Sequence, residues 1–313
     1  MLSSIPHGHW WEEDRPDEAH DLSSVLINRY RRQIRCPGFL GARLQGGYNR
    51  FSGVGDCILL NFTGGFFAVA DGSDRSPRAS REFMITFSRM IKNIGLQFTD
   101  RVFDRAELSA IRRRMSEESE KLLASLPFGP SSTFTGVLLL KSYAGMNGIV
   151  MHTGDSLLFR CDLQARIAGQ VTDSNFWMVG RSKRFFQIDE IPVDNATTLI
   201  LATDGLDGIA FAPGCSREEF VLNLAEEFSP DDLPDGLFST EESCPVGRDD
   251  VAIIAIHPYA ELGFCGSVII GGTSGQEEVT YEKERRSGCI PDRYEPVHRF
   301  DGYVGFPESL FLM

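Results

Sequence analysis

Residues 66–72 read FFAVADG and residues 198–205 read TLILATDG, so two short apolar runs each end in an Asp-Gly pair. Runs of this length, rich in aromatic and β-branched residues, are typical of buried strands. A carboxylate at the end of such a strand has a fixed backbone, and the glycine after it lets the chain turn sharply. Asp71 and Asp204 are therefore candidate site residues at the edge of a sheet.

Two further aspartates occupy the same context. Asp155 follows the apolar run that begins at Val150, and Asp249 stands at the start of the apolar run 251–256. One Asp-Gly pair after a strand is usually a plain turn, but four aspartates after strands that could share a sheet indicate a cation site. Oxygen ligands alone favour Mg²⁺ or Mn²⁺ over zinc. Two such ions bridged by one carboxylate could orient a phosphoryl oxygen and lower the pKa of a bridging water.

The rest of the pattern predicts an α+β domain with mainly antiparallel sheets, because strands and helices are segregated along the chain instead of alternating. Asn147-Gly148 and Gly154-Asp155 are expected to be breaks between strands. Strands are expected over 57–62, 66–70, 135–143, 148–153, 157–161, 198–205 and 250–256, and helices over 80–94, 107–126 and 217–228.

The two ends of the chain have fewer regular apolar runs than its middle. We expect an N-terminal arm (1–40), a central domain (41–257) and a C-terminal appendage (258–313). The arm has a candidate helix over 22–34, and its His7 and His9 are too few to make a strong metal site. The appendage contains one strand-like run, GFCGSVIIGG, and its sequence does not indicate a function.

Composition excludes several classes of protein. A formal net charge of −13 and a pI near 5.0 argue against nucleic acid as the main partner, since that binding depends on clustered Lys and Arg. Seven cysteines without a CxxC pair predict reduced, buried thiols. The start of the chain lacks the pattern of a signal peptide, and no apolar stretch is long enough to cross a membrane. We expect a cytoplasmic protein without membrane contact; the oligomeric state stays open.

Five motifs, in order along the chain, resemble those of the type-2C metal-dependent protein phosphatases, the PPM family. GVGDCILLN resembles the opening motif of that family and FFAVADG its FaVaDG motif. MHTGDS, LILATDGLDG and RDDVAIIAI resemble the three motifs that follow, and together they span about residues 44–257.

This resemblance implies a β-sandwich of two mainly antiparallel sheets flanked by helix pairs, with two Mg²⁺ or Mn²⁺ ions in a cleft at one end. It implies hydrolysis of phosphoserine and phosphothreonine in a phosphorylated protein substrate by attack of the hydroxide that bridges the ions. The implied metal ligands are Asp71, the Gly72 carbonyl, Asp204 and Asp249. Asp56 would hold metal-bound water, and Asp155 would support the weaker third ion of some members.

Some positions depart from the family pattern. Gly55 stands where the family has Glu, and Leu157 stands where it has Arg. The phosphate-binding arginine of the family falls on Phe51, so Arg50, one residue away, is a candidate contact only if the loop shifts, with Arg75 as an alternative. These departures leave a second hypothesis open, a weakly active or inactive pseudophosphatase that serves as a binding or regulatory module.

Overall fold

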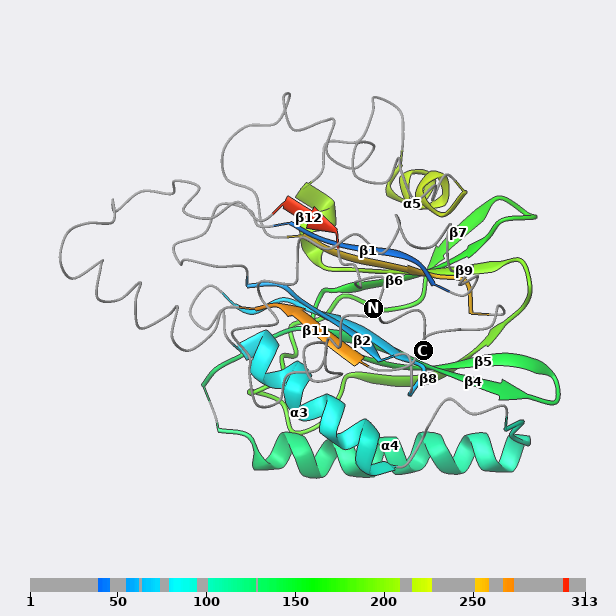
Figure 1. Ribbon diagram of the computed structural model, residues 1–313. Coiled ribbons are helices and arrows are strands. Elements are labelled where there is room, and N and C mark those ends of the chain that lie inside the picture. The colour runs from blue at the N-terminus through cyan, green and yellow to red at the C-terminus, as the bar shows by residue number, and fades with distance from the viewer. Residues whose placement is uncertain are drawn as a thin grey trace, which may run out of the picture.

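The chain forms two six-stranded sheets packed face to face with helices on their outer faces (Figure 1). The structure is a computed structural model. It describes residues 39–45, 55–61, 64–73, 79–94, 101–127, 129–208, 216–226, 251–258, 267–272 and 301–303.

Strand pairing within both sheets is antiparallel throughout, as the segregated pattern of the sequence predicts. One sheet, here called the β9 sheet, has the order β12 (Asp301–Tyr303), β1 (Phe39–Gln45), β10 (Val251–Ile256), β9 (Thr197–Ala202), β6 (Leu157–Asp162) and β7 (Ile167–Gln170). The other, the β3 sheet, has the order β11 (Ser267–Gly271), β2 (Cys57–Asn61), β3 (Phe66–Ala70), β4 (Phe134–Ser142), β5 (Gly145–Thr153) and β8 (Gln187–Val193).

Helices cover the outer face of each sheet in the parts that the structure describes (Figure 1). α3 (Ala79–Ile94) lies on β2, β3 and β11, and α4 (Arg105–Ser125) lies beside α3 and against β8. α5 (Arg217–Glu226) covers β6, β7 and β9. α4 begins in a capping box: Glu107 N–H donates to the Asp104 carboxylate at 2.8 Å, and Asp104 N–H donates to the Glu107 carboxylate at 2.9 Å. This satisfies backbone donors that a helix start otherwise leaves free.

The alternation of side chains along each strand builds three apolar layers. In β3, Phe66, Ala68 and Ala70 face α3 and α4, where the rings of Phe87 and Phe134 stack at 4.5 Å between centroids. The intervening side chains of β2 and β3 are fully buried and face the other sheet; they are Ile58, Leu60, Phe67 and Val69. A further cluster fills the space between the β9 sheet and α5.

One predicted break is wrong. Asn147 and Gly148 lie inside β5, and the turn comes earlier, at Tyr143 and Ala144, because Ser142 pairs directly with Gly145. The Asn147 side-chain amide instead donates to the Ser142 hydroxyl at 2.6 Å and supports the turn. The expected helix 217–228 is described over Arg217–Glu226, and strands β1, β7, β8 and β12 were not anticipated.

Two segments from the region beyond residue 257 lie at sheet edges. β11 pairs with β2 in the β3 sheet, and β12 pairs with β1 in the β9 sheet. The limits of the arm, the central domain and the appendage stay a prediction, since residues 1–38, with the expected helix 22–34, lie outside the described part of the chain. None of the described helices has the length and apolar character needed to cross a membrane.

Candidate active site

Four of the predicted aspartates lie at the same end of the sandwich. Asp56 comes just before β2 and Asp71 just after β3, and the neighbouring residues Cys57 and Ala70 are paired. In the other sheet Leu157, which begins β6, is paired with Ala202, which ends β9. The register therefore places Asp155 and Asp204 at one end of that sheet.

A hydrogen bond joins the two sheets at this end. The Thr203 hydroxyl donates to Oδ2 of Asp56 at 2.6 Å, and the Ala252 N–H donates to the Thr203 hydroxyl oxygen at 2.8 Å. Asp56 is 1% exposed and Thr203 is fully buried. Asp56 was predicted to hold metal-bound water. One of its carboxylate oxygens instead accepts a hydrogen bond that holds the ends of β9 and β10 against β2.

The backbone around Asp71 is held on both sides. Its N–H donates to the Thr133 hydroxyl at 2.9 Å, and its carbonyl accepts the Thr133 N–H at 2.9 Å and the Ser132 hydroxyl at 2.6 Å. The N–H of Gly72 donates to the Gly55 carbonyl at 3.1 Å. A half-buried carboxylate on such a backbone is well positioned in advance of any ligand.

Asp155 lies where the chain crosses from β5 to β6, and its side chain is exposed. Gly154 makes the turn possible: its φ is +102°, and a Cβ there would lie 2.7 Å from Thr133. The pKa of Asp155 is raised, first because neighbouring protein displaces part of its water and further because Asp207 is negative.

Asp207, whose negative charge acts on Asp155, also locates Asp204. Asp204 opens the short 3₁₀ helix η3 (Asp204–Gly208), so it stands one turn from Asp207. Arg217 of α5 donates to both carboxylate oxygens of Asp207, at 2.9 and 3.1 Å. The sequence reasoning passed over Asp207, although it lies within the quoted motif LILATDGLDG.

Two predicted residues, Asp249 and Arg50, lie outside the described residues, as does the alternative Arg75. Among the residues that the structure does describe, no group of three or more His, Cys, Asp or Glu is placed to hold a metal ion. Of the three predicted metal-binding aspartates, the structure therefore describes Asp71 and Asp204 but not Asp249.

Gly55 and Leu157, the two departures from the family pattern, are both part of the packed framework. The carbonyl of Gly55 accepts the Ser80 hydroxyl at 2.5 Å and the Gly72 N–H at 3.1 Å, so this residue ties β2 to α3 and to the segment after β3. Leu157 is 1% exposed and belongs to the apolar cluster under α5. A side chain at position 157 that faces this cluster cannot contact a phosphate at the surface.

Among the described residues, His152 and the thiols of Cys57 and Cys161 are buried. The ring of His152 is fully buried, with Nδ1 at 2.8 Å from the Thr135 hydroxyl and Nε2 at 3.0 Å from the Asp173 carbonyl. Burial lowers its pKa. Burial also raises the pKa of Cys57 and of Cys161 to about 12, so neither thiol is a ready nucleophile.

Comparison with known proteins identifies the fold. Neither protein-family models nor curated proteins give a match to this sequence. Among solved structures, the chain is similar to the S. agalactiae serine/threonine phosphatase, with a TM-score of 0.51 and 18% identity over 69% of this chain and 97% of that one.

Two other similar structures have lower TM-scores. The PPM Ser-Thr phosphatase MsPP from Mycobacterium smegmatis, in complex with cacodylate, has a TM-score of 0.45 and 18% identity over 70% of this chain and 98% of that one. The catalytic domain of the phosphatase PstP, in complex with two manganese ions, has a TM-score of 0.45 and 16% identity over 73% of this chain and 96% of that one.

The order of the antiparallel strands, the layers of the sandwich and the likeness to the S. agalactiae enzyme agree with one another. The chain has the α+β fold of the PPM-type serine/threonine phosphatases, as its motifs predict, and it is a divergent example of that fold.

Proposed function

We propose that this protein is a metal-dependent phosphatase of phosphoserine and phosphothreonine in proteins. One observation carries the proposal: Asp71, Asp155 and Asp204, from three separate strand ends, come to one end of a sandwich with a phosphatase-type fold. The motif at Asp249 supplies the remaining carboxylate in sequence. We also propose a cytoplasmic location and a phosphorylated protein as the partner.

The donor set at this end fits a hard divalent cation. Asp71 and Asp204 are half-buried and Asp155 is exposed, so carboxylate oxygens remain within reach of solvent. Carboxylate oxygen donors, with no exposed thiol beside them among the described residues, favour Mg²⁺ or Mn²⁺. Asp71, the Gly72 carbonyl, Asp204 and Asp249 would hold two ions, and Asp155 with Asp204 a weaker third. Bound there, such ions would polarise the phosphoryl oxygens and acidify a water.

The chain's own residues have separate tasks in this proposal. Thr133 and Ser132 hold the backbone of Asp71 and so fix the position from which its carboxylate would reach a metal ion. Asp56 and Thr203 keep the end of β9, and hence Asp204, in register with β2. Binding of the substrate phosphate is assigned to Arg50, one residue from the position of the family's phosphate-binding arginine, with Arg75 as the alternative.

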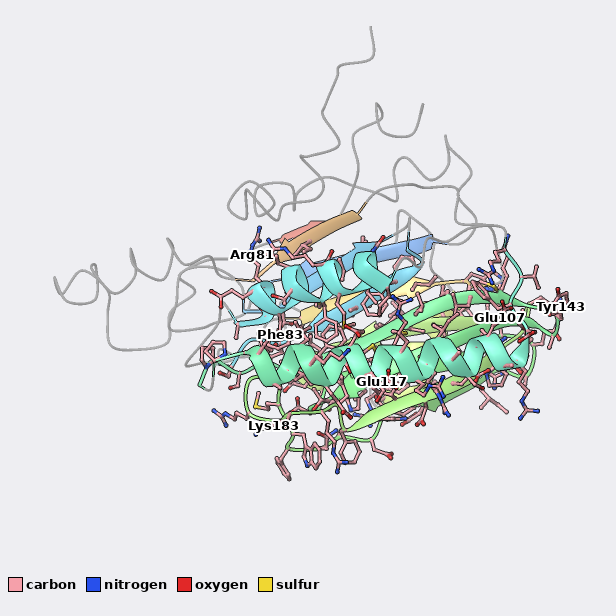
Figure 2. The ribbon with its side chains drawn as sticks, turned by 90° about the horizontal axis from the view of Figure 1, so that it is seen from below. Arg81, Phe83, Glu107, Glu117, Tyr143 and Lys183 are labelled. Carbon is pink, nitrogen blue, oxygen red and sulfur yellow. The ribbon has the colours of Figure 1, made fainter. Side chains whose placement is uncertain are left out.

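Turnover of p-nitrophenyl phosphate and of a phosphothreonine peptide with Mn²⁺ tests the proposal. Asp71→Asn, Asp204→Asn and Asp249→Asn are each expected to lower kcat/KM by at least about 100-fold, because metal stabilisation of transition-state charge is worth several kcal/mol. Glu117→Gln is the control, since it removes an exposed carboxylate on the outer helix α4 (Figure 2). Equal turnover by the wild type and the three Asn variants would refute the proposal.

The same proteins separate the proposal from its alternatives. Calorimetric titration with Mn²⁺ is expected to show saturable binding that Asp71→Asn weakens. Absence of binding at millimolar Mn²⁺, together with absence of turnover, would favour a pseudophosphatase that acts as a binding module. Faster hydrolysis of free nucleotides than of phosphopeptides would instead indicate a small-molecule phosphatase.

A further inference from the structure

The connection between β7 and β8, residues 171–186, presents three aromatic side chains to solvent. Phe176 is 103% exposed, Phe186 44% and Trp177 37%. Large aromatic side chains gathered on one exposed segment commonly mark an interaction site. We call Phe176, Trp177 and Phe186 the aromatic platform; neither the predicted chemistry nor the folding of the sheets requires their exposure.

Buried residues of the same segment hold the aromatic platform in place. Phe185, next to Phe186, is buried and meets the rings of Phe87 and Phe134 at 5.3 and 5.5 Å between centroids. Val179 is fully buried and exchanges two backbone hydrogen bonds with Ser132, at 2.9 and 3.2 Å. A surface whose supports are ordered in advance loses little conformational entropy when a partner binds.

The end of the platform near β5 is also anchored. Asn175 Oδ1 accepts the Gly154 N–H and the Trp177 N–H, both at 3.0 Å. The N–H of Asn175 donates to the Gly154 carbonyl at 2.8 Å. The exposed aromatic segment is thus fastened to the turn that carries Asp155.

The aromatic rings contact one another and a cation. Trp177 and Phe186 form an edge-to-face pair with centroids 5.7 Å apart, and the Arg184 guanidinium lies 5.3 Å from the centre of the Trp177 ring. Trp and Arg are the residues most enriched among the energetically dominant positions of protein interfaces. The aromatic platform and the adjacent Arg184 therefore have the composition of a protein-binding surface.

The charge beside the platform is opposite to that of the whole chain. Arg181, Lys183 and Arg184 are exposed, and none of them forms an ion pair with another described residue, while the chain carries a net charge of −13. A groove of about 470 Å³ runs between this segment and α4, and its lining residues are Glu120, Trp177, Ser182, Lys183 and Arg184. Figure 2 shows Lys183 near one end of α4, with Tyr143 at the other.

We infer that this groove and the aromatic platform form a docking surface for an acidic segment of a partner protein. An apolar side chain of that segment would pack on Trp177 and Phe186, and carboxylates beside it would pair with Arg181, Lys183 and Arg184. Such charge complementarity speeds encounter and fixes the register of the bound segment. The inference does not depend on phosphatase activity, because the docking surface contains none of the proposed metal ligands.

An anionic membrane is the less favoured occupant. The negatively charged Glu120 forms part of the wall of the groove. An anionic bilayer is extended and would also meet acidic residues outside the basic region, because the chain carries a net charge of −13. A short acidic peptide can instead enter the local basic region, because charges farther than about 8 Å are largely screened at physiological salt.

Selection from a phage-displayed library of random dodecapeptides against the full chain tests the inference. Enriched peptides are expected to carry Asp or Glu on either side of an aromatic or aliphatic residue. Fluorescence anisotropy of the best labelled peptide then gives its Kd. Trp177→Ala and Arg184→Glu are each expected to weaken binding at least about tenfold, as for the loss of a dominant interface contact.

Two matched variants serve as controls. Tyr143→Ala removes an aromatic side chain that is 83% exposed at the far end of α4, and Arg113→Glu reverses an exposed charge on α4. Both are expected to leave Kd unchanged, and thermal unfolding confirms that all four variants are folded. Enrichment of peptides without acidic residues, no enrichment, or equal effects of test and control variants would each overturn the inference. Binding to phosphatidylserine vesicles without binding to acidic peptides would also overturn it.

Discussion

The Thr203 hydroxyl and the Asp56 carboxylate, 147 residues apart in sequence, form a buried hydrogen bond of 2.6 Å between the two sheets. The Thr203 N–H also donates to the Ala252 carbonyl at 3.0 Å, so one residue links β2, β9 and β10. This link lies beside Asp71 and Asp204. The positions of Asp71 and Asp204 therefore depend on a hydrogen bond in which neither of them takes part.

Replacement of Thr203 by Val keeps the shape of the side chain but removes its hydroxyl. We expect Thr203→Val to lower the free energy of unfolding by about 2–3 kcal/mol, because a buried carboxylate oxygen loses a hydrogen-bond donor. Thr203→Ser retains the hydroxyl and should recover most of that loss. Urea unfolding followed by circular dichroism measures both variants.

A double-mutant cycle with Asp56→Asn shows whether the two residues act together. Coupling is expected to exceed about 0.5 kcal/mol, the usual limit for independent sites. Additive effects of the two substitutions would mean that the hydrogen bond does not fasten the sheets in solution.

Gly180 supports the segment that carries the aromatic platform. Its φ is +83°, and a Cβ at this position would lie 1.8 Å from the Pro130 carbonyl oxygen. Gly180→Ala should therefore destabilise the protein by about 2–4 kcal/mol, the range for backbone strain combined with a steric clash. Gly169→Ala is the control, because a Cβ there has no neighbour within 4 Å. Thermal unfolding compares them, and equal melting temperatures would contradict the geometry.

His152 should make stability depend on pH. Its pKa is lowered from the ordinary 6.5 by burial, so the unfolded chain takes up a proton at a higher pH than the folded chain does. Stability is expected to be greatest above pH 6.5 and to fall as the pH drops from there toward the pKa of the folded state.

His152→Gln removes this titration. The variant should be less stable by about 1–3 kcal/mol at neutral pH, because the ring is fully buried and hydrogen-bonded. Its unfolding free energy should nevertheless change less than that of the wild type between about pH 7 and pH 5.5, the range that contains the ordinary pKa of His. An identical slope in both proteins would show that another group carries the dependence.

Divalent metal should stabilise the folded protein if the proposed ligands bind it. At a free Mn²⁺ concentration about 100 times Kd, the free energy of unfolding is expected to rise by about 2.7 kcal/mol. Removal of the metal by EDTA should reverse this rise. Asp71→Asn and Asp204→Asn should lose most of the gain, and Glu117→Gln should keep it. Differential scanning fluorimetry with and without Mn²⁺ measures the effect; equal shifts in all four proteins would place metal binding elsewhere.

Much of the local structure was determined by the sequence itself. The strand Phe66–Ala70 has the predicted bounds, and α3 and α4 lie within two residues of theirs. The apolar runs and the Asp104 capping box act over a few residues, so they can be recognised without knowledge of the rest of the chain. For the same reason Asp71, Asp155 and Asp204 stand out as strand-end carboxylates.

Tertiary structure alone decided how these elements meet. The Asn147-Gly148 pair has the signature of a turn, yet it is a strand interior because β4 and β8 supply pairing partners on both sides. The Asp56–Thr203 bond and the exposure of Trp177 follow from contacts between residues far apart in sequence, which no local pattern encodes. The sequence by itself therefore determined the carboxylates and their strands. Packing of the two sheets determined that the carboxylates share one end and that an aromatic, basic surface lies beside α4.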